Sequence, residues 1–397
     1  MSVKFKRILW LQPDTTIDTF SSNVKGLQTL GANVVSMNYR DLVLNLGIRG
    51  ARIKLLNVIA DFDPDLILAS FFSDNYELSP EFLREISSKV SLVIHAGDDE
   101  IFGTWQTIYF AQSADAVMTC DYGGRFMYEQ LSIPTVYFRS PVLDFLGTPP
   151  VVERSIDVSF VGECDRADRS DYIEYLQRNG IKVETYGRGS ENGFVSRTDF
   201  LKIISKSRIT LNFSGRPVPL EILKKEPWRN HFKHLSGRAY EAARMQSFCL
   251  SEYCLGLDEM LSIGSEVDVF WDKQELLEKV KYYLKNDAER EGMAAKAFDK
   301  VRNEFDDLDY LCRSYNLLHE KLHNKKNRAV KYPVFRSFDF NASEVSANFL
   351  IFVFMLRLRK FSLALGVVPY FFSFNFSCMV GLWRGMGKLV SRVLLRR

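Results

Sequence analysis

Cysteine is scarce in this chain of 397 residues, and its six cysteines show no pattern. Without a CxxC pair or a metal-ligand spacing, the sequence argues against a disulfide framework and a cysteine-bound metal, and it favours free, buried thiols in a reducing cytoplasm. Repeats and low-complexity tracts are absent, and prolines are few. The composition, 46% hydrophobic and 25% charged, is typical of a globular protein whose length suits two domains.

A long hydrophobic run is missing from the start of the chain. Arg7–Leu11 is apolar, but Pro13 and Asp14 interrupt it, so the run is too short for the core of a secretory signal. We therefore expect a cytoplasmic protein.

Acidic residues are missing from the end of the chain. Val345–Arg397 contains eight basic residues and no acidic one, although the net charge of the whole chain is only +3. The preceding 344 residues therefore hold 44 basic and 49 acidic groups, a balance of −5. A globular part with that charge is a poor candidate for nucleic-acid binding.

The same tail is apolar. Phe361–Trp383 holds 23 uncharged residues between basic flanks, which is long enough to cross a bilayer. Pro369 and several polar residues weaken that interpretation, and basic residues on both sides give no clear orientation. We expect instead that 331–397 is a membrane-associating tail on the inner face of the cell membrane, with apolar helices in the interface and cations on anionic headgroups. The alternative is a helix that packs back on the first domain.

The order of apolar runs predicts an α/β fold with two Rossmann-like domains, 1–150 and 151–330, facing across a cleft. In each, strand-like runs alternate with helical patterns, which is typical of parallel sheets with right-handed crossovers. The break between them is Thr148-Pro149-Pro150, and Asn286–Leu322 is expected to close the second domain with one or two helices. The expected strands are Arg7–Leu11, Asn33–Met37, Leu66–Ser70, Leu92–His95, Ala116–Thr119, Thr135–Phe138, Asp157–Val161, Val183–Tyr186, Ile209–Phe213, Phe248–Ser251 and Val267–Phe270.

Glycines follow several strands of the second domain. Gly162 ends the first of these strands, with Arg166 and Arg169 just beyond, an arrangement in which a ligand can approach the backbone and an anion can meet a helix start. An ordinary tight turn with solvated arginines explains this piece equally well. Tyr186-Gly187-Arg188-Gly189 could wrap a base, and Leu211–Gly215 adds polar residues at the same sheet edge.

Ser236–Leu261 is the most informative stretch. Ser236 is a good N-cap, so Arg238 lies in a first helical turn, where free N–H groups attract phosphate. Glu241, three residues on, can accept hydrogen bonds from two ribose hydroxyls. The alternative is an Arg–Glu pair on an exposed helix, worth a few tenths of a kcal/mol. A second helix start at Gly256-Leu257-Asp258-Glu259 favours a diphosphate site.

In their order along the chain, these segments resemble the glycosyltransferase-like family of spore-maturation proteins, which belongs to the GT-B glycosyltransferases. The resemblance is best over roughly 155–320, and the first half resembles the family in strand order and in Val93–Asp99. The segments that carry it are Phe160-Val161-Gly162, Tyr186-Gly187-Arg188-Gly189, Ile209–Ser214, Gly237–Ala242, Gly256-Leu257-Asp258-Glu259, Phe270-Trp271-Asp272 and Val280–Leu284.

The resemblance implies a transferase that uses a nucleotide-diphosphate sugar, bound by the second domain, in the synthesis of a cell-surface glycan on a glycan or lipid-linked acceptor. Arg238 would neutralise the diphosphate and Glu241 would hold the ribose. Many retaining relatives have a glutamate eight residues before this one, where this chain has Lys233, which could act as a phosphate cation. The expected donor-binding residues are Gly162, Arg169, Tyr186, Gly187, Asn212, Lys233, Arg238, Glu241, Gly256 and Leu257.

No cofactor and no metal are expected, because helix dipoles and cations stabilise the leaving diphosphate in such enzymes. Asp63-Pro64-Asp65 has the spacing of a metal-binding DxD motif, but its proline indicates a turn. Two other functions stay open on this architecture. One is a nucleotide-sugar epimerase or hydrolase, and the other is a non-catalytic scaffold.

The acceptor side is expected in the first domain. His95, Asp98 and Asp99 stand at the end of one strand, where a base could take a proton from the acceptor hydroxyl. His95 is still inside the apolar run, so a hydrogen-bonded core histidine explains it at least as well. Asp98 or Asp99 is the better candidate for the base, although one of them can cap the next helix. Asp14 is a further candidate.

Overall fold

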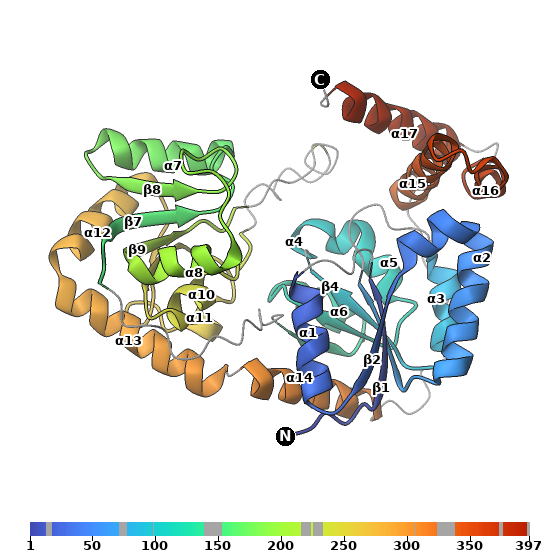
Figure 1. The fold of residues 1–397 in the computed structure, drawn as a ribbon, viewed down its shortest axis with the longest axis horizontal. Helices are drawn as coiled ribbons and strands as arrows, with labels where there is room; N and C mark the ends of the chain where they lie inside the picture. Colours follow the sequence, from blue (N-terminus) through green and yellow to red (C-terminus); the bar gives the residue numbers. More distant parts are fainter. Residues whose placement is uncertain are drawn as a thin grey trace. The chain divides into compact units, whose positions relative to one another are not determined.

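The computed structural model describes residues 1–12, 18–70, 78–97, 99–138, 153–215, 224, 233–305, 307–323, 338–372 and 376–394. The chain divides into two compact units, one of Met1–Leu143 with Leu311–Arg397 and one of Asp144–Tyr310. Each unit is built around its own parallel sheet (Figure 1). Asp14 and the proline break at 148–150 lie outside the described residues.

Unit 1 contains a six-stranded parallel sheet in the order β2-β1-β3-β4-β5-β6. The strands β3, β4 and β5 are buried along their whole length, because helices on both faces of a parallel sheet exclude water. All six predicted strands are confirmed. The elements are β1 (Arg7–Gln12), α1 (Asp18–Thr29), β2 (Asn33–Asn38), α2 (Tyr39–Phe62), β3 (Leu66–Ser70), α3 (Pro80–Ser87), β4 (Leu92–Ala96), α4 (Asp99–Phe102), η1 (Gly103–Thr107), α5 (Ile108–Ala111), β5 (Ala116–Thr119), α6 (Gly124–Gln130) and β6 (Thr135–Tyr137).

Unit 2 contains a five-stranded parallel sheet in the order β11-β10-β9-β7-β8. The chain places β8 on one side of β7 and then β9, β10 and β11 on the other side. Open α/β sheets bind ligands at such a point, where successive strands change sides. The predicted α/β class with two Rossmann-like domains is confirmed. The elements are β7 (Ile156–Val161), α7 (Ala167–Arg178), β8 (Val183–Tyr186), α8 (Arg197–Lys206), β9 (Ser207–Asn212), α10 (Arg238–Arg244), β10 (Phe248–Glu252), α11 (Leu257–Met260), β11 (Asp268–Phe270), α12 (Lys273–Lys285) and α13 (Asp287–Glu304).

The next helix, α14 (Asp307–His323), departs from the predicted boundaries. It was expected to close the second domain, but from Leu311 onward it belongs to unit 1. Tyr315 is fully buried against Phe138, with 5.9 Å between the ring centroids, and the Lys4 ammonium pairs with Glu320 at 3.0 Å. These contacts hold the helix on the first sheet, so the predicted limit of 151–330 is too long at its C-terminal end.

Three C-terminal helices also belong to unit 1: α15 (Phe338–Arg357), α16 (Phe361–Val367) and α17 (Phe376–Leu394). The ring centroids of Phe340 and Tyr109 are 4.2 Å apart, and Lys360 Nζ donates to the Leu44 carbonyl at 2.7 Å. The alternative that the tail packs back on the first domain is therefore confirmed. A short 3₁₀ turn, η3 (Val368–Tyr370), follows α16, and no helix within the described part of the chain is long and apolar enough to cross a membrane.

Candidate functional site

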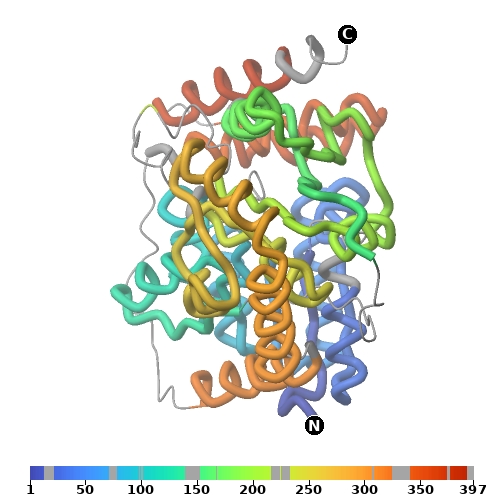
Figure 2. The backbone as a smooth tube through the Cα atoms, turned by 90° about the vertical axis from the view of Figure 1, so that its left-hand side faces the viewer, coloured from blue at the N-terminus to red at the C-terminus, as the bar shows by residue number. Residues whose placement is uncertain are grey.

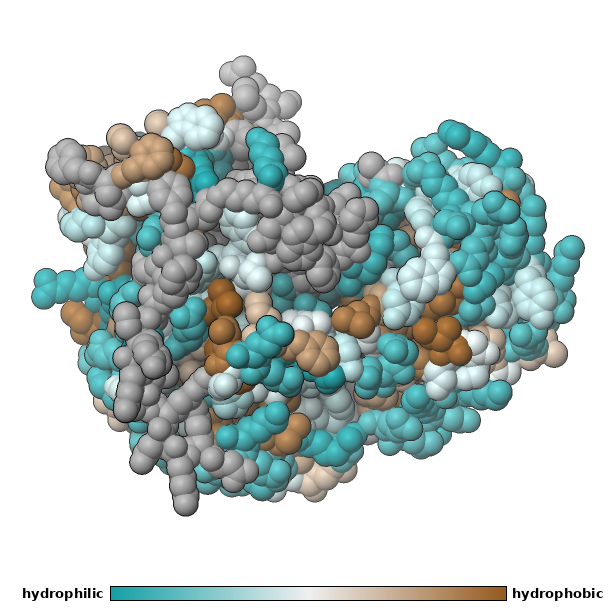
Figure 3. Space-filling model, turned by 180° about the vertical axis from the view of Figure 1, so that it is seen from behind, coloured by the Kyte–Doolittle hydropathy of each residue, from teal (hydrophilic) through white to brown (hydrophobic). Residues whose placement is uncertain are grey.

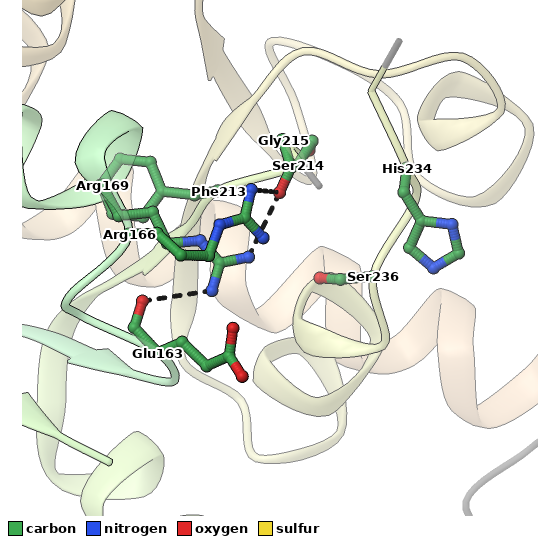
Figure 4. A pocket seen from close by; sticks show the side chains of 8 residues that line it. All are labelled: Glu163, Arg166, Arg169, Phe213, Ser214, Gly215, His234 and Ser236. Carbon is green, nitrogen blue, oxygen red and sulfur yellow. Dashed lines mark hydrogen bonds between the residues drawn. The ribbon is translucent and has the colours of Figure 1, made fainter. Parts of the chain in front are cut away.

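The carboxyl ends of the unit 2 strands form one edge, and a cavity of about 350 Å³ opens there. Parallel strands deliver their following loops to the same edge, so residues far apart in the sequence meet at this cavity. Its walls come from the segment after β7, from the start of α7, from the end of β9 and from the approach to α10 (Figure 4). The lining residues are Glu163, Arg166, Arg169, Phe213, Ser214, Gly215, His234 and Ser236.

Two arginines from the start of α7 point into this pocket. Arg166 and Arg169 both donate to the Gly215 carbonyl, and Arg169 also donates to the Glu163 carbonyl at 3.3 Å (Figure 4). Burial, followed by the nearby charge of Arg166, lowers the pKa of Arg169 to about 10, which leaves it charged at neutral pH. Arg169 Nε is buried and has no hydrogen-bond partner among the described residues. The pocket therefore holds two neighbouring cations, one with an unused donor.

Glu252, at the end of β10, shapes the other wall. Its Oε2 accepts hydrogen bonds from the backbone N–H groups of Ser214 at 2.8 Å and Gly215 at 3.1 Å. Its Oε1 pairs with Lys233 Nζ at 2.6 Å. The sequence interpretation missed Glu252, although a carboxylate that directly follows a buried apolar run is a detectable signal. Lys233 therefore already has a carboxylate partner, and its predicted contact with a phosphate stays a prediction.

Arg238 and Glu241 lie together in α10 as an ion pair, Nη1 to Oε2 at 3.1 Å. The pair is not the exposed one that we considered, because Arg197 from the start of α8 binds the second oxygen of Glu241 at 2.7 Å and both arginines lie over the Phe200 ring. Arg238 also donates to the Val161 carbonyl, and burial lowers its pKa. Each oxygen of Glu241 therefore already has an arginine donor, and the predicted ribose contact stays a prediction.

The helix starts that the sequence predicted are short. α10 has seven residues and α11 has four. Leu257 is fully buried in the core beside α10, and Gly256 adopts φ 87° to begin the turn.

Asn212 is also buried, donating to Ser251 Oγ and accepting from Ser236 Oγ at 2.6 Å. Its visible role is to hold Ser236 at the pocket wall.

The glycines after β7 and β8 bring two loops into contact. Gly162 N donates to the Tyr186 carbonyl at 2.8 Å, and the backbone of Gly187 lies directly over Gly162. A Cβ at position 187 would meet the Gly162 oxygen at 2.2 Å, and φ at this residue is 111°. The Tyr186 hydroxyl donates to Glu184 at 2.9 Å. Gly187 is therefore required by the local fold, and its predicted donor contact is untested.

In unit 1, His95 is a core residue. It is buried on β4, where Nδ1 lies 3.2 Å from Ser70 Oγ and the ring packs edge-on against Trp10 and Phe138. Burial lowers its pKa to about 4, so the imidazole is neutral at pH 7. The core-histidine interpretation accounts for all of these contacts. Asp98, the neighbouring candidate, lies outside the described residues.

Asp99 is also buried. Its Oδ2 accepts a hydrogen bond from Thr119 Oγ1 at 2.6 Å, and burial raises its pKa to about 7 against the opposing effect of that bond. The carboxyl thus joins the start of α4 to the end of β5.

Of the other carboxylates singled out, Asp65 accepts from the backbone N–H groups of Lys6 and Arg7, and Asp63 pairs with the Arg7 side chain. The DxD spacing is therefore explained by contacts at the start of β1.

The buried Asp99 gives a prediction about pH. In the folded chain this carboxyl keeps its proton up to about pH 7, whereas the unfolded chain releases it near pH 4, so its contribution to stability is present in acid and lost as pH rises through 7. Relative to Asp99→Asn, we expect the wild type to lose up to about 4 kcal/mol between pH 4 and 8. Calorimetric unfolding of both proteins across this range measures the difference. A constant gap between the two profiles would show that the carboxyl does not titrate in this window.

Comparison with known proteins places the pocket in a recognised kind of domain. Residues 166–307 match the family described as glycosyl transferase-like, and the match includes Arg166, Arg169 and most of the other lining residues. No curated protein matches the sequence.

Two solved structures resemble the chain over most of its length. Alr3699/HepE from Anabaena, in complex with UDP and glucose, has a TM-score of 0.54 at 13% identity, covering 81% of this chain and 100% of that one. Sucrose-phosphate synthase from Thermosynechococcus elongatus has a TM-score of 0.57 at 9% identity, with the same coverage. At such identities the likeness establishes the fold, which is the GT-B glycosyltransferase type. The narrower resemblance to spore-maturation proteins stays a prediction.

Proposed function

We propose that this chain is a glycosyltransferase that moves a sugar from a nucleoside-diphosphate sugar to an acceptor hydroxyl, with the nucleotide bound by unit 2. The proposal is supported by the glycosyl transferase-like match over 166–307 and by the GT-B fold. The single observation that carries it is the paired arginines, Arg166 and Arg169, in the pocket at the carboxyl edge of the unit 2 sheet.

The chemistry of this pair suits a diphosphate. Two guanidinium groups share the Gly215 carbonyl, and burial together with the charge of Arg166 lowers the pKa of Arg169. An incoming dianion would relieve that repulsion and accept charge-assisted hydrogen bonds, including one from the unused Arg169 Nε. The partly buried setting strengthens these interactions relative to water.

The same cations serve the transfer step. The bond between the sugar C1 and the diphosphate oxygen breaks, a bond from C1 to the acceptor oxygen forms, and the acceptor proton passes to a base. Negative charge grows on the leaving diphosphate, where fixed donors lower the barrier most. We therefore propose a metal-independent reaction of a hexosyl or related sugar that needs no further cofactor, with Asp98 kept as the proposed base.

The proposed setting is the inner face of the cell membrane, where the enzyme would extend a cell-surface glycan on a glycan or lipid-linked acceptor. The composition of the tail supports this proposal, because Val345–Arg397 combines eight basic residues with long apolar runs.

A binding screen tests the proposal. UDP and UDP-glucose come first, because Alr3699/HepE was solved with UDP, and GDP- and ADP-sugars follow. We expect one nucleoside diphosphate to raise the unfolding temperature, since a ligand that binds only the folded state stabilises it, and we expect the matching monophosphate to have little effect. A screen in which no diphosphate binds would contradict the proposal.

Incubation with a labelled donor then separates the remaining functions. A transferase releases nucleotide only when an acceptor is present, whereas an epimerase or hydrolase turns over without one. A scaffold would bind the donor and leave it unchanged.

A further inference from the structure

The last helix, α17, is apolar on two of its sides. Cys378, Gly381 and Gly385 form a buried side. On another side, every third or fourth residue is apolar and exposed, a spacing that places side chains on one helix face. These exposed residues are Phe376, Met379, Trp383, Met386 and Val390.

The buried side is explained by α15. A Cβ at Gly381 would meet the Ala342 oxygen at 2.5 Å, and a Cβ at Gly385 would meet the Phe349 ring at 2.7 Å, so the two helices run in the same direction in close contact. Figures 1 and 2 show α15 and α17 side by side. Glycines four residues apart permit this approach and hold α17 in a fixed orientation on unit 1.

The exposed side is strongly apolar, and its side chains are largely open to solvent. Trp383 is 73% exposed and Phe376 is 67% exposed. The neighbouring helices add Phe361 and Leu365 of α16, and Figure 3 shows hydrophobic side chains at the surface of the C-terminal helices, at its upper left. A surface of this kind is typical of a binding site for a protein or a membrane.

The charges around this surface decide between those partners. Arg357 and Arg359 are exposed at the end of α15, next to the exposed Leu356 and Leu358, and Arg384 and Lys388 lie within α17. No acidic residue occurs after Glu344. A second copy of the chain would bring the same cations against one another, whereas an anionic lipid surface offers opposite charge beside an apolar layer.

We propose that α17 is an interfacial membrane anchor. It lies in the plane of the bilayer surface, with Phe376, Met379, Trp383, Met386 and Val390 inserted among the acyl chains and the basic residues on anionic headgroups. The inserted element is therefore α17, fixed by α15, rather than the uncharged run 361–383. The proposal deepens the proposed function and rests on it for the idea that the acceptor is at the membrane, but the binding event itself needs no enzymatic activity.

Vesicle sedimentation of the full chain tests the anchor. We expect binding to phosphatidylcholine vesicles that contain roughly one third phosphatidylglycerol, and weak binding to phosphatidylcholine alone. The double variant Met379→Ser with Trp383→Ser should bind the anionic vesicles about tenfold less, because it removes two inserted side chains. Salt at about 1 M should also weaken binding, since it screens the headgroup charges.

Phe194→Ser is the matched control, because Phe194 is 83% exposed in unit 2, away from the C-terminal helices in the sequence, and its loss should leave vesicle binding unchanged. Equal vesicle binding by the wild type and the double variant would overturn the proposal. So would sedimentation velocity that shows a dimer lost in the double variant, since the surface would then be a protein interface. Binding of UDP by the double variant should match the wild type, so failure of UDP to bind either protein would count against the proposed function alone.

Discussion

Replacing Arg169 by glutamine should weaken the binding of UDP by roughly 30- to 150-fold, or about 2 to 3 kcal/mol, a typical value for hydrogen bonds to a charged group. The loss is expected to be large because Arg169 contributes both a charge and a buried donor, Nε, that has no hydrogen-bond partner among the described residues. Isothermal titration calorimetry with UDP measures the effect, and the nucleotide identified by the screen replaces UDP where it binds more tightly.

Without nucleotide, the same substitution should not lower the stability of the folded protein. Burial and the neighbouring Arg166 both disfavour the charged form of Arg169, so Arg169→Gln should be at least as stable as the wild type without nucleotide. Arg178→Gln is the control, because Arg178 is on the same helix and its exposed side chain pairs with Glu174 at 2.8 Å. UDP affinity that is equal in Arg169→Gln and the wild type would remove the pocket from the proposed mechanism.

Adding a single methyl group at Gly187 should destabilise unit 2 by 3 kcal/mol or more, about 6 to 12 °C in the midpoint of its unfolding transition. The added Cβ would meet the Gly162 oxygen at 2.2 Å, and that oxygen belongs to the backbone and cannot rotate away. The substitution also forces alanine to adopt a φ of 111°, which L residues rarely do. Scanning calorimetry of Gly187→Ala measures the loss.

Gly180→Ala separates the cost of the steric clash from the cost of the positive φ. Gly180 also has a positive φ, 80°, but no atom lies within 4 Å of the position where its Cβ would be. It should therefore cost only about 1 kcal/mol, from the backbone conformation alone. If the two variants lost the same amount of unfolding free energy, the loops after β7 and β8 would be able to move apart without cost. Reduced UDP binding by Gly187→Ala at low temperature, where it stays folded, would place these loops beside the nucleotide.

The strands could be predicted from the sequence because a parallel sheet buries both faces. Each strand then appears as a continuous apolar run such as Leu66–Ser70 or Phe248–Ser251, and local composition is enough to find it. The helices that connect the strands follow from the same alternation. The edge of unit 2 that carries the pocket was also predictable, because parallel strands send Gly162, Gly187 and Ser214 to one side.

The roles of individual charges depended on tertiary structure. Arg238 and Glu241 formed a credible ligand site in the sequence, but Arg197, more than forty residues earlier, occupies one oxygen of Glu241. Lys233 forms a backbone bridge with Gly215, which places it beside the end of β10. Its ammonium group there pairs with Glu252. An ion pair between distant segments leaves no local trace in the sequence, so a cation can be assigned to a ligand or to a carboxylate only once the chain is folded.

The α/β class, the positions of the strands and the unusual charge of the tail could all be read without a structure, since each depends on residues that are neighbours in the chain. Three features could be known only from the folded chain: α14 joins unit 1 from Leu311 onward together with the C-terminal helices, Arg166 and Arg169 share one pocket, and α17 keeps one apolar side exposed. These outcomes depend on which surfaces bury one another, and burial is a property of the folded chain as a whole.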